Sequence, residues 1–220
     1  MIKKVVGFSF YPWFIKEMSG YDTVLDLGAG SFNHLGEIGA KVKIGIESFQ
    51  PYIDNAVFKD CHMICGNMIH YRDLTMDLWE GRKAVMLIDA LEHIPMPFAM
   101  KLVKELKEDF DKILIMSPRG YDYQDKDVTG LGNDEGQTHK SFWFDEDMEK
   151  LNMTEVLVDE DYHRNEHPFP DKGCYFAVWN KKTFPGILSA IIVDDDYFDL
   201  MYKDDVLRAF FDYQDQFIRQ

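Results

Sequence analysis

The sequence contains few cysteines and few basic residues. Its three cysteines, Cys61, Cys65 and Cys174, are odd in number and have no disulfide-framework spacing, which argues against a disulfide scaffold and suits a reducing compartment. The 220 residues include 24 Lys and Arg against 39 Asp and Glu, which gives a formal net charge of −15. Because nucleic-acid affinity comes largely from Lys and Arg side chains that neutralise phosphates, this balance disfavours a nucleic-acid partner.

Long apolar segments are also missing. No run approaches the roughly 20 apolar residues that a membrane-spanning helix needs. The N-terminal stretch VVGFSFYPWF is interrupted by Pro12 and lacks a small-residue cleavage site, so we do not expect a secretory signal. We therefore expect a cytoplasmic protein with no membrane partner. The acidic stretch IIVDDDYFDLMYKDD near the C-terminus is typical of a solvated face.

Short apolar runs alternate with amphipathic stretches along the first half of the chain. Runs that predict strands lie at 23–27, 41–47, 61–65, 83–89 and 111–117. Several are almost continuously apolar, as expected for strands buried on both faces of a parallel sheet. Helices are predicted between them at 32–39, 51–57, 71–79 and 97–110. This strand–helix repetition predicts right-handed crossovers and a doubly wound, Rossmann-like α/β fold.

The second half of the chain has a different pattern. A long polar loop at 118–141 precedes a predicted helix at 144–151, and two strands at 154–162 and 173–180 are close enough to form an antiparallel pair. A short aromatic helix is predicted at 10–18. We interpret the chain as a single domain with an N-terminal cap (1–20), a core (21–180) and a helical C-terminal extension (181–220). If residues 183–220 form an interface, the chain would dimerise.

The stretch VLDLGAGS places Asp26, Gly28 and Gly30 at the end of the first strand of this series. Ligands of such sheets bind at the carboxyl ends of the strands, and glycine lets the backbone approach a ligand closely. Glu47 ends the next strand, seventeen residues after Gly30. A carboxylate at that point can accept both hydroxyl groups of a ribose. The pattern therefore suits a nucleotide-like cofactor, with a ligand-free βα turn as the alternative.

Two details separate the possible cofactors. A dinucleotide fingerprint requires a third glycine at position 33, where this chain has Asn33. Asp26 would also repel a pyrophosphate, whereas an acidic turn suits a cationic ligand such as a sulfonium with a free amino group. We therefore favour S-adenosylmethionine over NAD.

The order VLDLGAGS, GIE, CGNM and DALEHIP resembles that of the class I S-adenosylmethionine-dependent methyltransferase family over roughly residues 21–180. The resemblance implies a seven-stranded, mostly parallel sheet with an antiparallel C-terminal pair. It also implies donor contacts: Gly28 and Gly30 to the methionine part, Glu47 to the ribose, Asn67 with Met68 to the adenine, and Asp89 to Leu91 at the methionine end. Asn67 departs from the family, which often has an aspartate there. Asp26 completes the predicted donor site.

DALEHIP places Asp89, Glu92 and His93 directly after an apolar strand. His93 or Glu92 could act as a general base toward an acceptor hydroxyl. Alternatively, these residues only shape the site and cap the following helix, since methyl transfer depends mainly on alignment. A third interpretation makes Asp89, Glu92 and His93, with the later His139, ligands of a divalent metal ion.

The metal interpretation has a parallel in known enzymes. The pattern of an acidic residue, Glu-His and a later His139 is similar to that of metal-dependent small-RNA 2′-O-methyltransferases and of some quinone O-methyltransferases. Asp89 is shorter than the glutamate found there, and Glu-His at this site is also common in methyltransferases without metal. We therefore do not predict a metal.

The segment QTHKSFW (137–143) is similar to one in related small-molecule methyltransferases, so we expect the long loop to fold over the substrate. Tyr121, Tyr123 and Trp143 could stack there on a planar or sugar substrate.

These patterns predict a methyltransferase that acts on an oxygen, less readily a nitrogen, of a small molecule by in-line displacement at the sulfonium methyl. His93, His139 and Glu92 are the catalytic candidates. The alternatives are an NAD-dependent oxidoreductase, and a non-catalytic protein of the same fold that binds a partner protein through its acidic tail.

Overall fold

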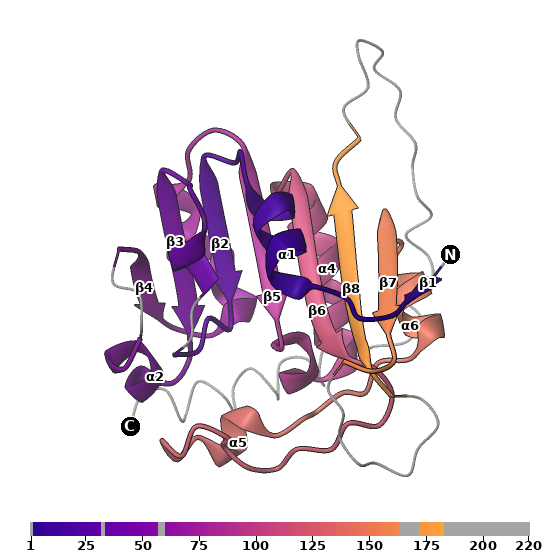
Figure 1. Cartoon of the computed structure of the whole chain (residues 1–220). Helices are drawn as coiled ribbons and strands as arrows, with labels where there is room; N and C mark the ends of the chain where they lie inside the picture. Colours follow the sequence, from indigo (N-terminus) through magenta and orange to yellow (C-terminus); the bar gives the residue numbers. More distant parts are fainter. Residues whose placement is uncertain (1, 32–33, 57–59, 163–171, 183–220) are drawn as a thin grey trace. The chain divides into compact units, whose positions relative to one another are not determined.

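The computed structural model of the protein describes residues 2–31, 34–56, 60–162 and 172–182. Its centre is a mixed sheet whose eight described strands have the order β1-β7-β8-β6-β5-β2-β3-β4 (Figure 1). Neighbouring strands are parallel except that β8 is antiparallel to both β7 and β6. The strands span Ile2–Val5 (β1), Thr23–Leu27 (β2), Val42–Glu47 (β3), His62–Cys65 (β4), Lys83–Ile88 (β5), Lys112–Pro118 (β6), Glu155–Asp159 (β7) and Cys174–Asn180 (β8).

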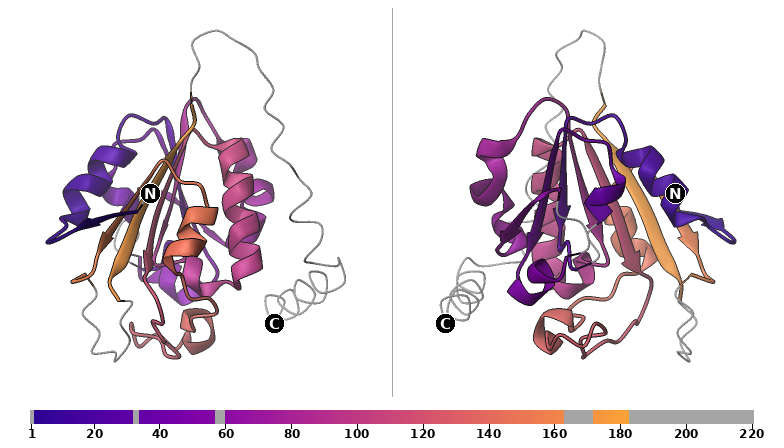
Figure 2. Two further views of the ribbon diagram at one scale, coloured as in Figure 1. Left: turned by 90° about the vertical axis from the view of Figure 1, so that its right-hand side faces the viewer. Right: turned by 60° about the vertical axis from the view of Figure 1, so that its left-hand side comes forward.

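Helices cover both faces of the sheet, with α1 on one face and α4 on the other (Figure 2). The α-helices span Phe10–Met18 (α1), Gln50–Asp54 (α2), Tyr71–Thr75 (α3), Met96–Asp109 (α4), Asp134–Gln137 (α5) and Asp145–Lys150 (α6). Short 3-10 helices span His34–Glu37 (η1), Met68–His70 (η2), Met76–Leu78 (η3) and Leu91–His93 (η4).

The central strands are apolar because both of their faces are buried. Along β2, Val24 packs into the core on the α1 face, which includes Phe14. Leu25 and Leu27 pack into the core on the α4 face, which includes Leu102. A strand that faces a core on each side cannot alternate polar and apolar residues, and this explains the continuous apolar runs in the sequence.

The predicted fold class is confirmed, and the sheet contains one strand beyond the seven expected. The additional strand is β1, which pairs in parallel with β7 through the register Ile2↔Val156 to Val5↔Asp159. Its sequence IKKV has two lysines between two apolar residues and only partial burial. A short edge strand of this kind lacks the apolar run that identifies the central strands.

Most predicted helices are present, but several are shorter than expected. The helices predicted at 10–18, 97–110 and 144–151 correspond to α1, α4 and α6. The stretch 32–39 contains the single turn η1 in its described part, in agreement with the poor helix propensity of Gly36 and Gly39. The predicted helix 71–79 divides into α3 and η3, and α2 is confined to Gln50–Asp54.

Alternate residues of a strand share one face, so the apolar run 61–65 predicts that Cys61 and Cys65 are buried thiols, and this prediction is wrong. Cys65 is exposed and Cys61 is only partly buried. β4 is the last of the described strands in the sheet order, so one of its sides has no neighbouring strand among them, and solvent reaches its end. Cys174, in the interior strand β8, is buried.

Two sets of predictions fall on residues outside the described ranges. Apart from residues 181 and 182, the C-terminal extension lies there, and so do His163 and His167, which the sequence connects with no ligand. Within the described ranges, no helix has both the length and the apolar character needed to cross a membrane.

The strand order indicates where a ligand would bind, at the carboxyl ends of the strands. The chain proceeds from β2 to β3 and β4 in one direction, whereas β5 and β6 lie on the other side of β2. The strand order therefore reverses between β2 and β5, and ligands of open α/β sheets bind beyond the carboxyl ends of the strands at such a point. Residues 119–144, which follow β6, run beneath these ends (Figure 1).

Candidate active site

The glycine turn after β2 is packed tightly against the residues that follow β5. The backbone N–H groups of Gly28 and Ala29 both donate to the carbonyl of Ile46 in β3, at 2.9 and 3.0 Å. Gly28 has a φ of +77°, and a Cβ at this position would lie 2.8 Å from Cβ of Ala90. Both observations require glycine here. The backbone thus closes the end of the sheet without a side chain at Gly28.

Glu47 connects this turn to the end of β3. Its Oε2 accepts a hydrogen bond from the N–H of Gly30 at 3.0 Å, and its Oε1 accepts one from the N–H of Phe49 at 2.8 Å. Burial raises the pKa of the carboxyl, and the N–H groups of Phe49 and Gly30 act in the opposite direction. Oε1 also accepts a long hydrogen bond of 3.4 Å from the hydroxyl of Ser48. Because a carboxylate oxygen has two lone pairs, Oε2 retains acceptor capacity, and a ligand hydroxyl could replace the long Ser48 contact at Oε1.

Asp26 lies within β2, one residue before the turn begins, and its side chain is buried. Within the described part of the chain, its Oδ2 has no hydrogen-bond partner, and the backbone N–H of His34 bonds to the carboxyl group. Burial raises the pKa of Asp26 to about 7, and the negative charge of Glu47 adds to this effect. The buried carboxyl group of Asp26 therefore precedes the turn, and its charge changes near neutral pH.

Asn67 and Met68 follow β4 and approach the same turn. The side-chain oxygen of Asn67 accepts the N–H of Ile69 at 3.1 Å and caps η2. Cε of Met68 would lie 3.3 Å from a Cβ at Gly28. Met68 is therefore next to the glycine turn, while the Asn67 oxygen is engaged in a local cap.

Asp89 is the first residue after β5 and has an unusual backbone conformation. Its φ is +47°, and Asn152 is the other non-glycine residue with positive φ in the described ranges. Such a conformation is uncommon for side chains other than glycine, and it is concentrated at functional sites. The Asp89 side chain is exposed. Its N–H donates to the carbonyl of Met116 at 3.0 Å, which holds the strained residue to the end of β6.

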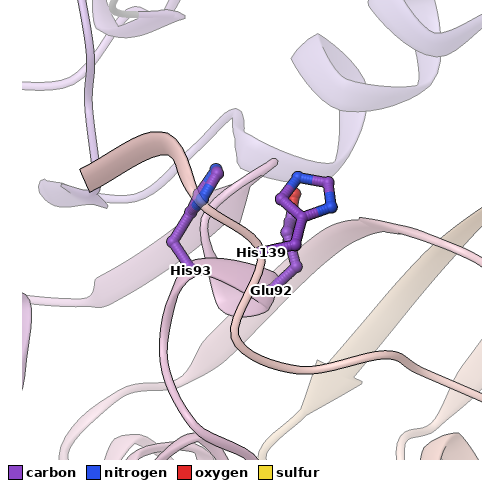
Figure 3. Close-up of side chains that lie close together, drawn as sticks. All are labelled: Glu92, His93 and His139. Atoms are coloured by element: carbon purple, nitrogen blue, oxygen red, sulfur yellow. The ribbon is translucent and has the colours of Figure 1, made fainter. Parts of the chain in front are cut away.

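Glu92, His93 and His139 come together beside this residue (Figure 3). One possible ligand atom from each residue lies within 4.8 Å of those of the other two. The rings of His93 and His139 have centroids 5.0 Å apart. A carboxylate and two imidazoles in this arrangement could hold a divalent metal ion. Asp89, the fourth residue of the sequence pattern, is not a member of this group.

Both histidines contact a backbone carbonyl through Nδ1. Nδ1 of His139 lies 2.5 Å from the carbonyl oxygen of Asp122, and Nδ1 of His93 lies 3.4 Å from that of Thr138. A carbonyl oxygen only accepts hydrogen bonds, so this geometry favours the tautomer with the proton on Nδ1. Each Nε2 then has a lone pair available to bind a proton or a metal ion.

Glu92 is 2% exposed and is held by Ser117 at the end of β6, whose hydroxyl donates to Oε2 at 3.0 Å. Burial, together with the negative charge of Asp89, raises its pKa well above the ordinary value for glutamate. Its Oε1 has no hydrogen-bond partner among the described residues. A buried carboxyl oxygen without a partner is costly, and it marks a position where a ligand or an ion would bind.

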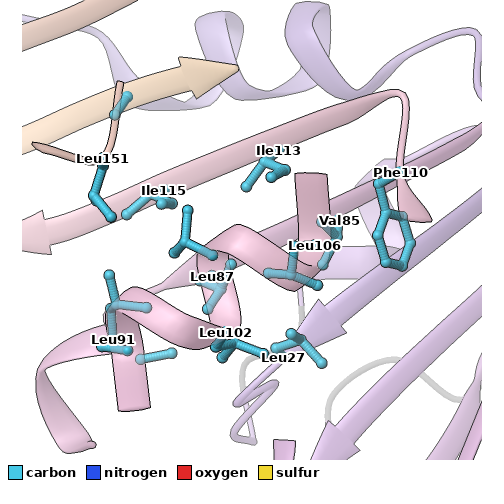
Figure 4. Close-up of a cluster of buried hydrophobic side chains, with 14 of the residues drawn as sticks. Leu27, Val85, Leu87, Leu91, Leu102, Leu106, Phe110, Ile113, Ile115 and Leu151 are labelled. Carbon is cyan, nitrogen blue, oxygen red and sulfur yellow. The ribbon is translucent and has the colours of Figure 1, made fainter. Parts of the chain in front are cut away.

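Leu91 contributes less than the sequence suggested. Its side chain is fully buried in the core on the α4 face, near Leu87 and Leu102 (Figure 4). Only the backbone of Leu91 could therefore contact a donor molecule. An apolar side chain on the first turn after a strand can face either the core or the ligand, and the sequence does not distinguish the two.

We call residues 119–144 the strap. Its second half is attached to the turn after β5, because the N–H groups of Lys140 and Ser141 donate to the carbonyl of Glu92 at 2.8 and 3.1 Å. The base of the strap is held by Arg119, which binds Asp145 through two hydrogen bonds of 2.9 and 3.1 Å. The strap therefore lies across the carboxyl ends of the strands, and the expectation that it covers a substrate there stays a prediction.

The aromatic residues of the strap differ in what they can contact. Trp143 is fully buried in the core, so the prediction that it stacks on a substrate is wrong. Tyr121 packs against Phe142 and Phe144 and keeps half of its surface exposed. Tyr123 is 63% exposed and remains free to contact a ligand.

Several residues of this region were not identified from the sequence. Ser117 is the polar residue that ends an apolar strand, and this position could have marked it. Tyr52 and Asp127 form a hydrogen bond of 2.7 Å between α2 and the strap. Asp122 holds His139 through its backbone carbonyl, a group that every residue type has, so the identity of residue 122 gives no signal. No local pattern identifies these last contacts, because each depends on a partner far away in the sequence.

No protein-family model matches the sequence, and no curated protein matches it. Solved structures do show similarity. The N-terminal domain of EvdMO1, determined in the presence of S-adenosylhomocysteine (SAH) and D-fucose, has a TM-score of 0.54 and 14% identity over 78% of this chain and 81% of that chain. A SAM-dependent methyltransferase from Archaeoglobus fulgidus has a TM-score of 0.52 and 16% identity, covering 77% of this chain and 90% of that chain. The small RNA methyltransferase HEN1 has a TM-score of 0.52 and 13% identity, covering 79% of this chain and 25% of that chain.

At these identities the similarity concerns the fold. The protein has the fold of class I S-adenosylmethionine-dependent methyltransferases, as the order of its motifs predicted.

Proposed function

We propose that the protein is an S-adenosylmethionine-dependent methyltransferase that methylates an oxygen atom of a small molecule. The observation that carries this proposal is the position of Glu47. Its buried carboxylate ends β3, binds the glycine turn after β2 through Gly30, and so lies next to the β2–β5 boundary where the strand order reverses. S-adenosylmethionine supplies an electrophilic methyl group on a sulfonium centre.

The chain's own residues would hold this donor from three sides. Glu47 would accept the ribose hydroxyls with its remaining lone pairs, and the turn at Gly28 would admit the methionine part where a side chain would obstruct it. Asp89 and Asp26 supply negative charge near a cationic ligand. Asn67 and Met68 would lie against the adenine.

The cluster of Glu92, His93 and His139 would then face the acceptor. Burial lowers the pKa of His93 to about 4, and the neighbouring His139 adds to this effect, so the imidazole of His93 is neutral at physiological pH. A neutral imidazole can accept a hydrogen bond from the acceptor hydroxyl. His139, whose Nδ1 is held by Asp122, can receive the hydroxyl proton at Nε2 as the oxygen attacks the methyl group.

A metal-assisted mechanism is the second candidate, favoured by the compact three-residue group and by the buried Oε1 of Glu92 that lacks a partner among the described residues. A divalent ion held there would lower the pKa of the acceptor hydroxyl. In that case Glu92, His93 and His139 would be ligands instead of proton acceptors.

A small-molecule acceptor is more consistent with the charge of the chain than a nucleic acid. The net charge of −15 would repel a phosphate backbone, so an RNA substrate such as the one in the name of the small RNA methyltransferase HEN1 is disfavoured for this chain. The structure of the EvdMO1 domain was determined in the presence of D-fucose, which makes sugars a sensible first class of acceptors to test. We retain the cytoplasmic location and the possible homodimer as predictions.

Calorimetric titration with S-adenosylmethionine, SAH and NAD tests the donor assignment. We expect the first two to bind and NAD to fail. Glu47→Gln should weaken SAH binding by about 100-fold, because a charged hydrogen-bond acceptor contributes about 1.5–3 kcal/mol. Glu37→Gln, at an exposed glutamate of η1, is the matched control and should bind as the wild type does. Binding of NAD alone, or of no cofactor, would favour an oxidoreductase or a non-catalytic partner protein.

Thermal unfolding of the same protein distinguishes the general-base mechanism from the metal-assisted one. Thermal unfolding is measured with EDTA and with added Mg²⁺, Mn²⁺ or Zn²⁺, for the wild type, His93→Ala and His139→Ala. A metal-dependent rise in melting temperature that both variants abolish would establish a coordination site. If the wild type shows no response while methyl transfer to a hydroxyl acceptor still depends on both histidines, the general-base mechanism is supported.

A further inference from the structure

The strap crosses the part of the sheet where the donor would bind. One of its attachments is to Glu92 after β5, and another is to Tyr52 of α2, which follows β3. In the sheet, β2 lies between β5 and β3. A segment attached on both sides must therefore pass the carboxyl end of β2, where Gly28 and Gly30 form the turn.

The attachment to α2 is built around one carboxylate of the strap. Oδ1 of Asp127 accepts hydrogen bonds from the hydroxyl of Tyr52 at 2.7 Å, from the N–H of Thr129 at 2.8 Å and from its hydroxyl at 2.7 Å. Oδ2 accepts the N–H groups of Gly132 and Asn133 at 2.8 and 3.1 Å. Asp127 thus orders the turn 127–133 and presents it to Tyr52.

Tyr52 is the fixed side of this contact. It is 2% exposed, and its ring packs edge-on against Phe49, with centroids 5.1 Å apart. The N–H of the same Phe49 donates to Glu47, the proposed ribose ligand. The phenol is therefore held in place by the residues that form the donor site, while its partner belongs to the strap.

From this arrangement we propose that the Tyr52–Asp127 hydrogen bond is a latch that holds the strap across the donor site and thereby limits the release of the donor and of its product. The proposal rests on the proposed function as far as the ligand is concerned. Tyr52 and Asp127 are positioning residues, because they act by holding the strap that covers the donor and carries His139.

The contact can be removed without leaving a buried group unpaired. In Tyr52→Phe the ring still fills its place against Phe49, and Oδ1 of Asp127 keeps both hydrogen bonds from Thr129. The variant therefore tests the latch instead of the core. The matched control is Val128→Ala in the same strap, which shortens a side chain that is 77% exposed and leaves Tyr52 and Asp127 unchanged.

Two measurements test the latch. Stopped-flow displacement of SAH should show dissociation about tenfold faster from Tyr52→Phe than from wild type or Val128→Ala, the factor expected from losing about 1.4 kcal/mol. Limited trypsin digestion without ligand should cut Tyr52→Phe faster within the strap, where Lys126 is exposed. Circular dichroism melting checks that all three proteins are equally folded.

The outcomes separate the latch from the proposed function. If the wild type does not bind SAH, the proposed function fails, and faster strap proteolysis in Tyr52→Phe would still show that the bond holds the strap. If the wild type binds SAH and Tyr52→Phe changes neither the dissociation rate nor the cleavage rate, the latch is overturned. Asp127→Asn is the second variant: it turns one of the two acceptor oxygens into an NH2 donor, so either the Tyr52 and Thr129 side or the Gly132 and Asn133 side loses its acceptor, and it should accelerate both rates at least as much.

Discussion

The two halves of the candidate site are constructed differently. The donor half, at the ends of β2 and β3, consists mainly of backbone groups and one carboxylate: Gly28 bonds to Ile46, and Glu47 bonds to Gly30 and Phe49. All of these residues lie between positions 28 and 49 of the sequence, at the ends of two adjacent strands. The local sequence therefore determines most of this half.

The acceptor half depends on side chains that come from separate parts of the chain. Ser117 at the end of β6 holds Glu92, and the strap brings His139 to His93 from 46 positions further along. A buried glutamate with a raised pKa and two clustered imidazoles gain little stability from one another. We therefore expect changes in the donor half to affect folding strongly, and changes in the acceptor half to affect chemistry more than stability.

The largest effect on stability is expected from Gly28→Ala in the donor half. The substitution places a Cβ 2.8 Å from that of Ala90 on a backbone with φ of +77°. We expect a loss of about 4 kcal/mol in the free energy of unfolding, the sum of left-handed backbone strain and overpacking, measured by urea denaturation. Gly30→Ala is the control, because its φ is +58° but, among the described residues beyond its two chain neighbours, no atom lies within 4 Å of the added Cβ. It should lose only about 1–2 kcal/mol. Equal losses in the two variants would show that the contact with Ala90 has no energetic weight.

Asp26→Asn should have the next largest effect, and its sign depends on pH. Burial raises the pKa of Asp26 to about 7, above that of an unfolded aspartate. The folded wild type then binds more protons than the unfolded chain between about pH 4 and pH 7, so its stability falls as pH rises through this range. Asn has no proton to lose, so its stability does not fall in this way. Without ligand, the free energy of unfolding of the variant should therefore rise relative to that of the wild type by about 3 kcal/mol between about pH 5 and pH 8.

Urea denaturation at several pH values provides the measurement, and Asp22→Asn provides the opposite case. Hydrogen bonds from Arg82 and Lys41 lower the pKa of Asp22, which is at the surface. The charged form of Asp22 is therefore the stabilising one, and its contribution is lost as pH falls. If Asp26→Asn shows the same pH dependence as wild type, the raised pKa of Asp26 is refuted.

The smallest effect on stability, and the sharpest test of the comparison, is Ser117→Ala in the acceptor half. The variant removes the hydroxyl that donates to Oε2 of Glu92. We expect the free energy of unfolding to fall by about 1 kcal/mol. The activation free energy of methyl transfer should rise by more than this, and SAH affinity should be unchanged. Ser141→Ala, whose hydroxyl makes a long 3.4 Å contact with the carbonyl of Leu91, is the control for both measurements. A parallel loss of SAH affinity in Ser117→Ala would show that the two halves are not separable.

Local patterns were sufficient for the fold class and for placing the glycine turn and Glu47 at the ends of neighbouring strands. The continuous apolar runs exist because central strands have a core on each side, and the glycines mark a turn that admits no Cβ at Gly28. Glu47 could be anticipated because the carboxyl ends of neighbouring parallel strands meet at one edge. The edge strand β1 was not predicted, since its pairing partner β7 lies about 150 residues further along.

Only the tertiary structure decided what the remaining side chains do. Residue type alone does not determine whether Leu91, Trp143 and Cys65 are buried, because burial depends on what packs against them. Leu91 and Trp143 lie in the core, whereas Cys65 is exposed on an edge strand. The contacts of Tyr52 with Asp127 and of His93 with His139 likewise join segments that no local spacing relates. The physical reason is that backbone preferences and apolar periodicity act over a few residues, whereas side-chain contacts and burial depend on segments that meet only in the folded chain.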